Sequence, residues 1–285
     1  MENTDAWSEV EVALVNGKSR LVSSKNLQPL KILNPGSGYD SCHVVLSSYG
    51  GGMVSGDQIN LRITCGAQSR LFLSTQANTK IFKSTNQADA EQHFKAHVGE
   101  NGLAVSFPDP VVPQEKSRYR QTQHWHLHPS AVLLAVDWFH SGRMDQGERF
   151  VFEAFSSELK VTVGEKLVLL DRFAFTPEEH IATSPANFET YQTMFSAYLV
   201  GSPGNHRFAQ LAQTLQELKM PGSTGLDFNM TEKDYVLSVS EAKEGVYVLR
   251  AMGKTRQDLQ PLCQQLLQTL SGPEFFGYNP LERKY

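Results

Sequence analysis

The sequence predicts a mainly β fold with a few α-helices near the C-terminus. Short apolar runs recur through the first 180 residues, and Gly, Pro, Asn or Asp separates them. Several of these runs alternate between apolar and polar side chains, as strands with one buried face do. Beyond residue 200, two segments instead repeat apolar side chains at three- and four-residue spacing, which is typical of amphipathic helices.

The first strands follow from turn signals and alternation. Asn16-Gly17 is typical of a two-residue hairpin, so residues 9–15 and 18–25 are predicted to pair. Further strands are predicted at residues 59–65, 69–75, 79–85, 91–98, 103–107, 131–139, 149–155, 158–163 and 165–175. Residues 131–139 are apolar on both alternating faces, so we expect a central strand that is covered on both sides.

The C-terminal third mixes both element types. Residues 188–200 are compatible with a helix or a strand. Residues 206–220 predict a helix with an apolar stripe of Phe208, Leu211, Leu215 and Leu218, and Pro221-Gly222 is expected to stop it. Residues 234–240 and 245–252 then resemble the two arms of a hairpin.

A last helix is predicted from Thr255, with Asp258 three residues later as the partner of a capping box. Its apolar stripe comprises Leu259, Leu262, Leu266 and Leu270, and Gly272-Pro273 ends it. No exact repeat, low-complexity tract or clear linker interrupts the chain. We therefore expect a single domain over residues 1–285, β-rich over 1–180 and mixed over 181–285.

The overall composition is that of a soluble protein and weighs against two classes of partner. The net charge is −4 and the pI is about 6.1, whereas nucleic acids and anionic membranes attract concentrated positive charge. No apolar run approaches the length of a membrane span, and the acidic N-terminus lacks the pattern of a signal peptide. Three widely spaced cysteines form no disulfide or zinc pattern, so the expected location is the cytoplasm.

Residues 48–63, with the sequence SYGGGMVSGDQINLRI, are rich in glycine, as phosphate-binding loops are. Such a loop requires a following helix whose N-terminus meets the phosphates, and Asp57 is instead followed by an alternating strand. An aspartate beside phosphates would also repel them. The pattern favours a tight turn with positive φ at glycines and with Asp57 capping local backbone amides.

His124, His126 and His128 lie at alternate positions of a predicted strand and form the clearest metal candidate. Their side chains are expected on one face, about 7 Å apart per step. Neighbouring pairs can share Ni or Zn with help from another segment, whereas all three cannot easily do so. The alternative is a solvent-exposed polar face opposite a buried Trp/Leu face.

Two further loops carry polar residues. Gly142, Arg143, Gly147 and Glu148 follow the most apolar strand, where charged residues form ion pairs or line a cleft or interface. Asp109 stands between two prolines in FPDPVVP, which favours an extended or turn geometry. This segment is either a rigid connector or a well-positioned ligand.

Together these segments resemble the urease accessory protein family UreD, called UreH in some bacteria. The resemblance lies in residues 51–57, 74–84, 107–121 and 136–148, and in flanking residues 17–35, 245–255 and 277–285. Order and spacing match across nearly the whole chain, and SYGGGMVSGD is more similar to eukaryotic members than to the usual bacterial form.

The resemblance implies a fold and a function that composition cannot show. UreD-like proteins have β-sheets stacked in a helical, solenoid-like arrangement, with a few helices. They are scaffolding chaperones rather than enzymes, and they bind apo-urease together with the helical partner UreF and the GTPase UreG. Nickel would be transient cargo, with no permanently bound cofactor, and an interior passage has been proposed as its route.

Several residues in the family-like segments are candidates for that role: Gly51, Gly52, Gly56, Asp57, Thr75, Gln76, Lys80, Asp109, Gly142, Arg143, Gly147 and Glu148. We expect Asp57 and Glu148 to attract the cation and Arg143 to orient one of them, while Lys80 can be a structural counter-ion. No catalytic residue is expected. Two rival interpretations are a β-rich hydrolase with a Cys/His or Asp/Glu site and a metal-independent β-solenoid binding module.

Overall fold

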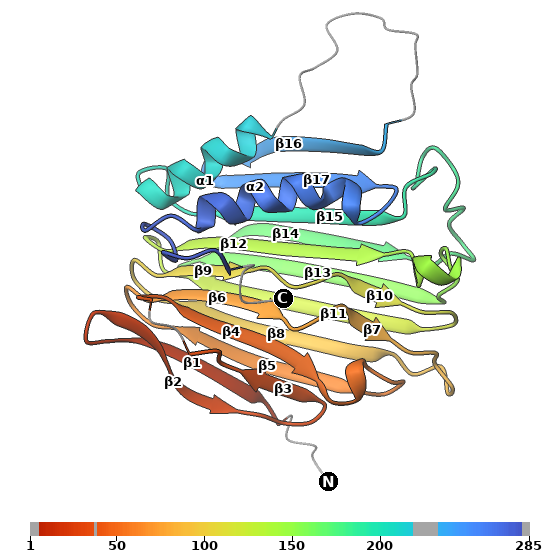
Figure 1. Cartoon of the computed structure of the whole chain (residues 1–285), viewed down its shortest axis with the longest axis horizontal. Helices are drawn as coiled ribbons and strands as arrows, with labels where there is room; N and C mark the ends of the chain where they lie inside the picture. Colours follow the sequence, from red (N-terminus) through yellow and green to blue (C-terminus); the bar gives the residue numbers. More distant parts are fainter. Residues whose placement is uncertain (1–5, 37–38, 219–232, 281–285) are drawn as a thin grey trace, which may run out of the picture.

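The computed structural model describes residues 6–36, 39–218 and 233–280. The chain forms two large β-sheets that stack face to face, and two helices cover the outer face of one of them (Figure 1). The seven-stranded sheet has the order β14-β13-β11-β8-β5-β1-β2, and the main path of the ten-stranded sheet is β16-β17-β15-β12-β9-β6-β4-β3. The predicted mainly β, solenoid-like fold is confirmed.

The strands of the seven-stranded sheet are β1 (Ser8–Val15), β2 (Lys18–Lys25), β5 (Gln58–Cys65), β8 (Ala90–Val98), β11 (Arg118–Leu127), β13 (Ala154–Val163) and β14 (Lys166–Phe175). Those of the ten-stranded sheet are β3 (Leu30–Leu33), β4 (Cys42–Ser48), β6 (Arg70–Thr75), β7 (Thr79–Ile81), β9 (Leu103–Ser106), β10 (Val111–Pro113), β12 (Val132–His140), β15 (Thr193–Val200), β16 (Tyr235–Lys243) and β17 (Val246–Gly253). The helices are α1 (His206–Glu217) and α2 (Gln260–Leu270).

The central strands alternate between the sheets along the chain. From β4 to β13, each strand of the ten-stranded sheet is followed by a strand of the seven-stranded sheet, apart from the short β7 and β10. Within each sheet these strands pair in parallel: β4, β6, β9 and β12 on one side, and β5, β8, β11 and β13 on the other. Each pair of strands is therefore one coil of a short solenoid.

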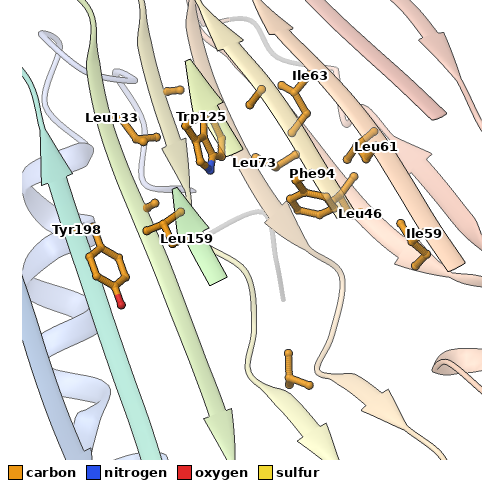
Figure 2. Close-up of a cluster of buried hydrophobic side chains, with 14 of the residues drawn as sticks. Leu46, Ile59, Leu61, Ile63, Leu73, Phe94, Trp125, Leu133, Leu159 and Tyr198 are labelled. Atoms are coloured by element: carbon orange, nitrogen blue, oxygen red, sulfur yellow. The ribbon is translucent and has the colours of Figure 1, made fainter. Parts of the chain in front are cut away.

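Two hydrophobic cores hold the layers together. One lies between the sheets and includes the fully buried Trp125 and Leu61 of one sheet and Leu133 of the other (Figure 2). The second lies between the ten-stranded sheet and the two helices, where Leu211 and Leu266 are fully buried. β12 contributes alternate side chains to both cores, which confirms the predicted strand covered on both sides.

Local signals are confirmed where they are strong. Asn16 and Gly17 both have positive φ in the β1–β2 hairpin, and β16 pairs with β17. Thr255 and Asp258 form the predicted capping box: the Thr255 amide donates to Asp258 Oδ2 at 2.7 Å, and the Asp258 amide donates to Thr255 Oγ1 at 3.4 Å. α1 ends at Glu217, and the predicted stop at Pro221-Gly222 lies outside the described residues.

Three predicted elements differ from those in the structure. Residues 188–200 form a strand only from Thr193, and of residues 79–85 only Thr79–Ile81 is a strand. The strand predicted at 149–155 was wrong over 149–153, because Phe150 has a positive φ of 52° and the chain reaches β13 only at Ala154. The apolar residues of this stretch, Phe150 and Phe152, instead pack into the inter-sheet core as part of an aromatic cluster.

Tight turns at one end of the solenoid set how closely the coils approach each other. A Cβ added at Gly99 would lie 2.8 Å from the backbone N of Ala67 and 3.0 Å from the carbonyl carbon of Gly66. These atoms belong to the turn of the preceding coil, between β5 and β6. No flexible side chain is available to move away.

Gly99→Ala is therefore expected to lower the free energy of unfolding by about 1–3 kcal/mol, since backbone of two coils must separate. Chemical denaturation would measure it. Gly204→Ala is the matched control, because the nearest atom to its added Cβ is 3.9 Å away. Equal effects of the two substitutions would contradict close packing of the coils.

Candidate functional site

The family-like segments meet at the opposite end of the solenoid from the tight turns. Four connections run there from the ten-stranded to the seven-stranded sheet: residues 49–57, 76–89, 107–117 and 141–153. Because the strands that they join are parallel, these connections stack on one another. β7 pairs with β10, and Met53 forms a bridge with Ile81, so neighbouring connections are also hydrogen-bonded.

The glycine-rich segment is a tight elbow between β4 and β5. Gly50, Gly51 and Gly56 have φ values from 74° to 84°, a region that favours glycine. A Cβ at Gly52 would lie 2.7 Å from the Lys80 carbonyl oxygen, because the next connection passes directly over it. The predicted turn with positive φ is confirmed.

Asp57 closes this elbow. Its Oδ2 accepts a hydrogen bond of 2.8 Å from the Val54 amide, and its own amide donates to the Val54 carbonyl at 3.0 Å. The Asp57 carbonyl accepts from the Glu91 amide at the start of β8, which ties the elbow to the next coil. The predicted capping role is confirmed, and a contact between Asp57 and nickel stays a prediction.

Arg143 was expected to orient either Asp57 or Glu148, and in the structure it holds Glu148. Glu148 Oε2 accepts from the Arg143 amide at 3.0 Å, and Oε1 accepts from Arg143 Nε at 2.9 Å and from Nη2. Hydrogen bonding from Arg143 lowers the pKa of Glu148. Gly142 leaves room for this pair, since an added Cβ would lie 2.8 Å from the Glu148 Cβ, and Gly147 ends the intervening turn in the left-handed region.

Asp57 and Glu148 lie in the first and last of the four stacked connections. Three strand spacings separate β5 from β13, about 14 Å. At this separation the two carboxylates do not form one shared metal site.

Thr75 and Asp109 join the second and third connections. Thr75 Oγ1 donates to Asp109 Oδ2 at 2.9 Å and accepts from the Asp109 amide at 2.7 Å. Asp109 is only 4% exposed, and Arg256, at the start of the last helical segment, lies 3.4 Å from its Oδ1. The Arg256 guanidinium also lies over the Trp138 ring. Asp109 is thus a buried, positioned carboxylate rather than a residue of an exposed connector.

Gln76 and Lys80 lie at the surface of the second connection. Gln76 lines an outer pocket, and Lys80 lines a separate groove with Gly142 and Arg143. Within the described part of the chain, Lys80 has no carboxylate at ion-pair distance, which argues against its predicted role as a counter-ion.

A polar cavity interrupts the apolar core behind these connections. It has a volume of about 30 Å³, room for about two water molecules. Its polar lining comprises Ser74, Thr75, Thr79, Gln92, Ser106, Asp109, Gln121, Gln123 and Asp137. These side chains come from both sheets, so the cavity lies between them.

Asp137 is the centre of a hydrogen-bond network in this cavity. Its Oδ1 accepts from Gln121 Nε2 at 2.7 Å, and its Oδ2 accepts from the Ser157 hydroxyl. Gln121 in turn accepts from the Tyr119 hydroxyl at 3.1 Å. Burial raises the pKa of Asp137, while the bonds from Ser157 and Gln121 oppose that shift.

The cavity is adjacent to two larger pockets and shares lining residues with each. An outer pocket of about 460 Å³, lined by Gly51, Gln76 and Asn78, shares Thr75 and Gln92 with it. A second pocket of about 330 Å³, between α2 and the ten-stranded sheet, shares Asp109 and other residues with it. The hydrogen-bonded pair Thr75–Asp109 therefore contributes to the lining of all three cavities.

The histidine row is not a three-ligand site. β11 ends at Leu127, and His128 Nδ1 bonds to Ser130 Oγ at 2.8 Å. The rings of His124 and His126 have centroids 3.9 Å apart, closer than the predicted step, and His126 Nδ1 bonds to Thr162. Over residues 6–36, 39–218 and 233–280, no three His, Cys, Asp or Glu side chains are grouped to hold a metal ion.

The comparisons with known proteins identify the family. A family model described as UreD urease accessory protein matches residues 5–284. The chain belongs to the UreD family. This confirms the resemblance drawn from the four segments.

Curated UreD relatives include bacterial and plant proteins. A urease accessory protein UreD of Cytophaga hutchinsonii is 36% identical over 276 residues, 96% of each chain. A urease accessory protein D of Arabidopsis thaliana is 32% identical over 201 residues, covering 69% of this chain and 68% of the relative. A protein of the same name from Oryza sativa subsp. indica is 28% identical over 229 residues, 77% of this chain and 74% of its own.

Sequence reasoning missed the polar interior of this UreD family member. From the sequence, Asp137 was treated only as part of an apolar strand. A carboxylate within such a strand indicates polar partners inside the core, because a buried charge without partners is unfavourable. In β11, the inward-facing positions are Tyr119, Gln121, Gln123, Trp125 and Leu127. Two consecutive glutamines on an otherwise apolar face indicate a polar cavity, and only the histidines opposite them were considered. The sequence around Arg256 contains no local pattern that predicts its contact with Asp109.

Asp137→Asn is expected to remove a pH dependence of stability. The folded-state pKa of Asp137 is raised above its ordinary 3.8, so its contribution to stability is present at low pH and is lost as the pH rises through the folded value. The unfolding free energy of the variant relative to wild type should therefore increase with pH above about 3.8. Urea denaturation at several pH values measures this, with the exposed Asp234→Asn as control; parallel profiles of variant and wild type would contradict it.

The remaining metal hypothesis for the histidines concerns the pair His124 and His126. Burial, His126 and two lysines lower the pKa of His124 to about 4, so its imidazole is neutral at pH 7 and able to ligate. Calorimetric titration with nickel should show one weak equivalent that the triple alanine variant of His124, His126 and His128 loses. Unchanged stoichiometry would remove this site.

Proposed function

We propose that this UreD family member is a cytoplasmic scaffold for urease maturation. In this proposal it binds apo-urease and, with a UreF-like helical protein and a UreG-like GTPase, assists delivery of nickel into the urease active site. It performs no catalysis of its own. Membership in a family of urease accessory proteins supports the role, and one structural observation carries the nickel route: Thr75 and Asp109 together line three neighbouring cavities.

The lining of these cavities suits transient contact with a divalent cation. Hydroxyl, amide and carboxylate oxygens surround the central cavity, and nickel exchanges more readily from such ligands than from thiolates. The raised pKa of Asp137 shows that charge in this position is disfavoured without a partner. A passing cation would supply that partner, and it would meet Asp109 next.

The thiols of the inter-sheet core do not compete for the metal. Burial raises the pKa of Cys42 to about 11 and that of Cys65 to about 12. Both remain protonated at neutral pH, and a protonated thiol is neither a nucleophile nor a good metal ligand. This argues against a hydrolase with a nucleophilic cysteine as well as against a tight thiolate trap.

The glycine elbow supports a division of labour with the GTPase partner. Its backbone is closed by Asp57, and a strand rather than a helix follows it. Phosphate binding at a helix N-terminus is therefore not available in this segment. GTP hydrolysis is assigned to the UreG-like protein, and this chain contributes binding surfaces and the cavities.

The proposal is tested by activating purified apo-urease with nickel, GTP, this chain and its two partner proteins. Asp137→Asn and Thr75→Val are near-isosteric changes in the cavity lining, and each should slow nickel incorporation on the order of tenfold. Metal analysis of urease measures incorporation, and pull-downs verify that complexes still form. Asp234→Asn, at the surface, is the control. Normal incorporation with both cavity variants would exclude this route, whereas failure of the wild-type chain to bind urease or its partners would exclude the scaffold itself.

The predicted nickel contacts at the surface are tested separately in cells. Asp57→Ala and Glu148→Ala are expected to reduce urease activation at unchanged protein level and unchanged complex formation. Full activation would exclude these carboxylates as nickel contacts. Their presence would then be explained by their structural roles alone: Asp57 closes the elbow, and Glu148 pairs with Arg143.

A further inference from the structure

The outer face of the seven-stranded sheet carries a row of three cationic side chains and one histidine, which is neutral at pH 7. In the parallel register, Arg62 of β5 is opposite Lys95 of β8, Lys95 is opposite His124 of β11, and His124 is opposite Lys160 of β13. Their neighbours along each strand, such as Ile63, Phe94 and Leu159, are buried in the inter-sheet core. Alternation therefore places the cationic row on the opposite, outward face.

This face is uncovered in the described structure, because α1 and α2 pack on the other sheet (Figure 1). The row is also incompletely neutralised. Arg62 is paired with Glu9 at 3.2 Å, but Lys95 and Lys160 have no carboxylate within ion-pair distance over the described residues. In the adjacent row, Glu158 is already paired with Arg172.

Arg62 and Lys95 are directly opposite each other, and like charges at such positions of a sheet are unfavourable. Among the described residues, Trp7 compensates Lys95 in part, because the Lys95 ammonium lies 4.7 Å from the centre of the Trp7 ring. Over the described residues, Lys95 and Lys160 thus remain without a carboxylate partner on this face, and they would attract an acidic surface.

Apolar side chains flank the cationic row. Trp7, half-buried, precedes β1 at one side and also contacts Arg62. At the other side, Leu170 of β14 is opposite Lys160 and is 42% exposed, and nearby Leu167 is 45% exposed. A charged centre between apolar anchors is the pattern of a protein-binding surface rather than of a simply solvated face.

The dimensions indicate the shape of the partner. Strands lie about 4.8 Å apart, and acidic side chains on one face of an α-helix recur about every 5 Å along its axis. From β1 to β14 the row crosses five strand spacings, about 24 Å, the length of a helix of about 16 residues. We propose that this face docks an acidic amphipathic helix of a partner protein, laid across the strands with its apolar ends on Trp7 and Leu170.

Fluorescence anisotropy tests this with the full chain in EDTA, so that nickel binding plays no part. The probe is a labelled 16-residue helical peptide with glutamates on one face and leucines at both ends of that face. It should bind to wild type and lose at least tenfold in affinity with Lys95→Glu/Lys160→Glu. Lys31→Glu/Lys243→Glu carries the same charge change on exposed positions of the other sheet and should bind normally.

Three results would overturn the proposal. The first is equal loss of affinity in the two double variants at unchanged melting temperature, which would indicate a general charge effect. The second is equally tight binding of a peptide of the same composition with scrambled order. The third is preferential binding of phosphatidylserine vesicles or of duplex DNA through Lys95 and Lys160, which would assign the face to a membrane or to nucleic acid.

Discussion

The parallel pairing of strands that alternate between two stacked sheets is the constraint on which the rest of the structure depends. Each parallel ladder aligns the ends of β4, β6, β9 and β12 and those of β5, β8, β11 and β13. All connections from the ten-stranded to the seven-stranded sheet must then lie at one end of the solenoid, and all return connections at the other end. Short turns such as that at Gly99 occupy one end, and the long polar connections stack at the other. Asp57 and Glu148, far apart in sequence, belong to one surface for this reason.

The second feature is the polar network inside the inter-sheet core. Burial of Asp137 beside Gln121 and Ser157 is unfavourable compared with an apolar filling of the same space, and only complete hydrogen bonding makes it tolerable. Natural cores retain such groups when they serve a purpose. The polar cavity and its two neighbouring pockets distinguish the interior from an ordinary β-sandwich core, and they are the basis of the proposed nickel route.

Much of the fold and some of the site were readable from sequence. Alternation located most strands, the Thr255–Asp258 capping box located the last helical segment, and the glycine elbow with its aspartate was predicted with its correct backbone character. Arg143 was expected to orient Asp57 or Glu148, and only the structure shows that its partner is Glu148. Residues 149–153 were misread, since their phenylalanines pack into the core from a loop and imitate a strand.

The sequence by itself determined the class of fold, the local turns and, through its motifs, membership in the UreD family. Only the tertiary structure decided which polar residues meet. Thr75 and Asp109 are 34 residues apart and Asp109 and Arg256 are 147 apart, and parallel stacking and docking of the last helix bring them together. The same holds for the row of Arg62, Lys95, His124 and Lys160, whose alignment depends on strand register. Local patterns encode which face a side chain takes, whereas register between distant strands is set by packing of the whole core.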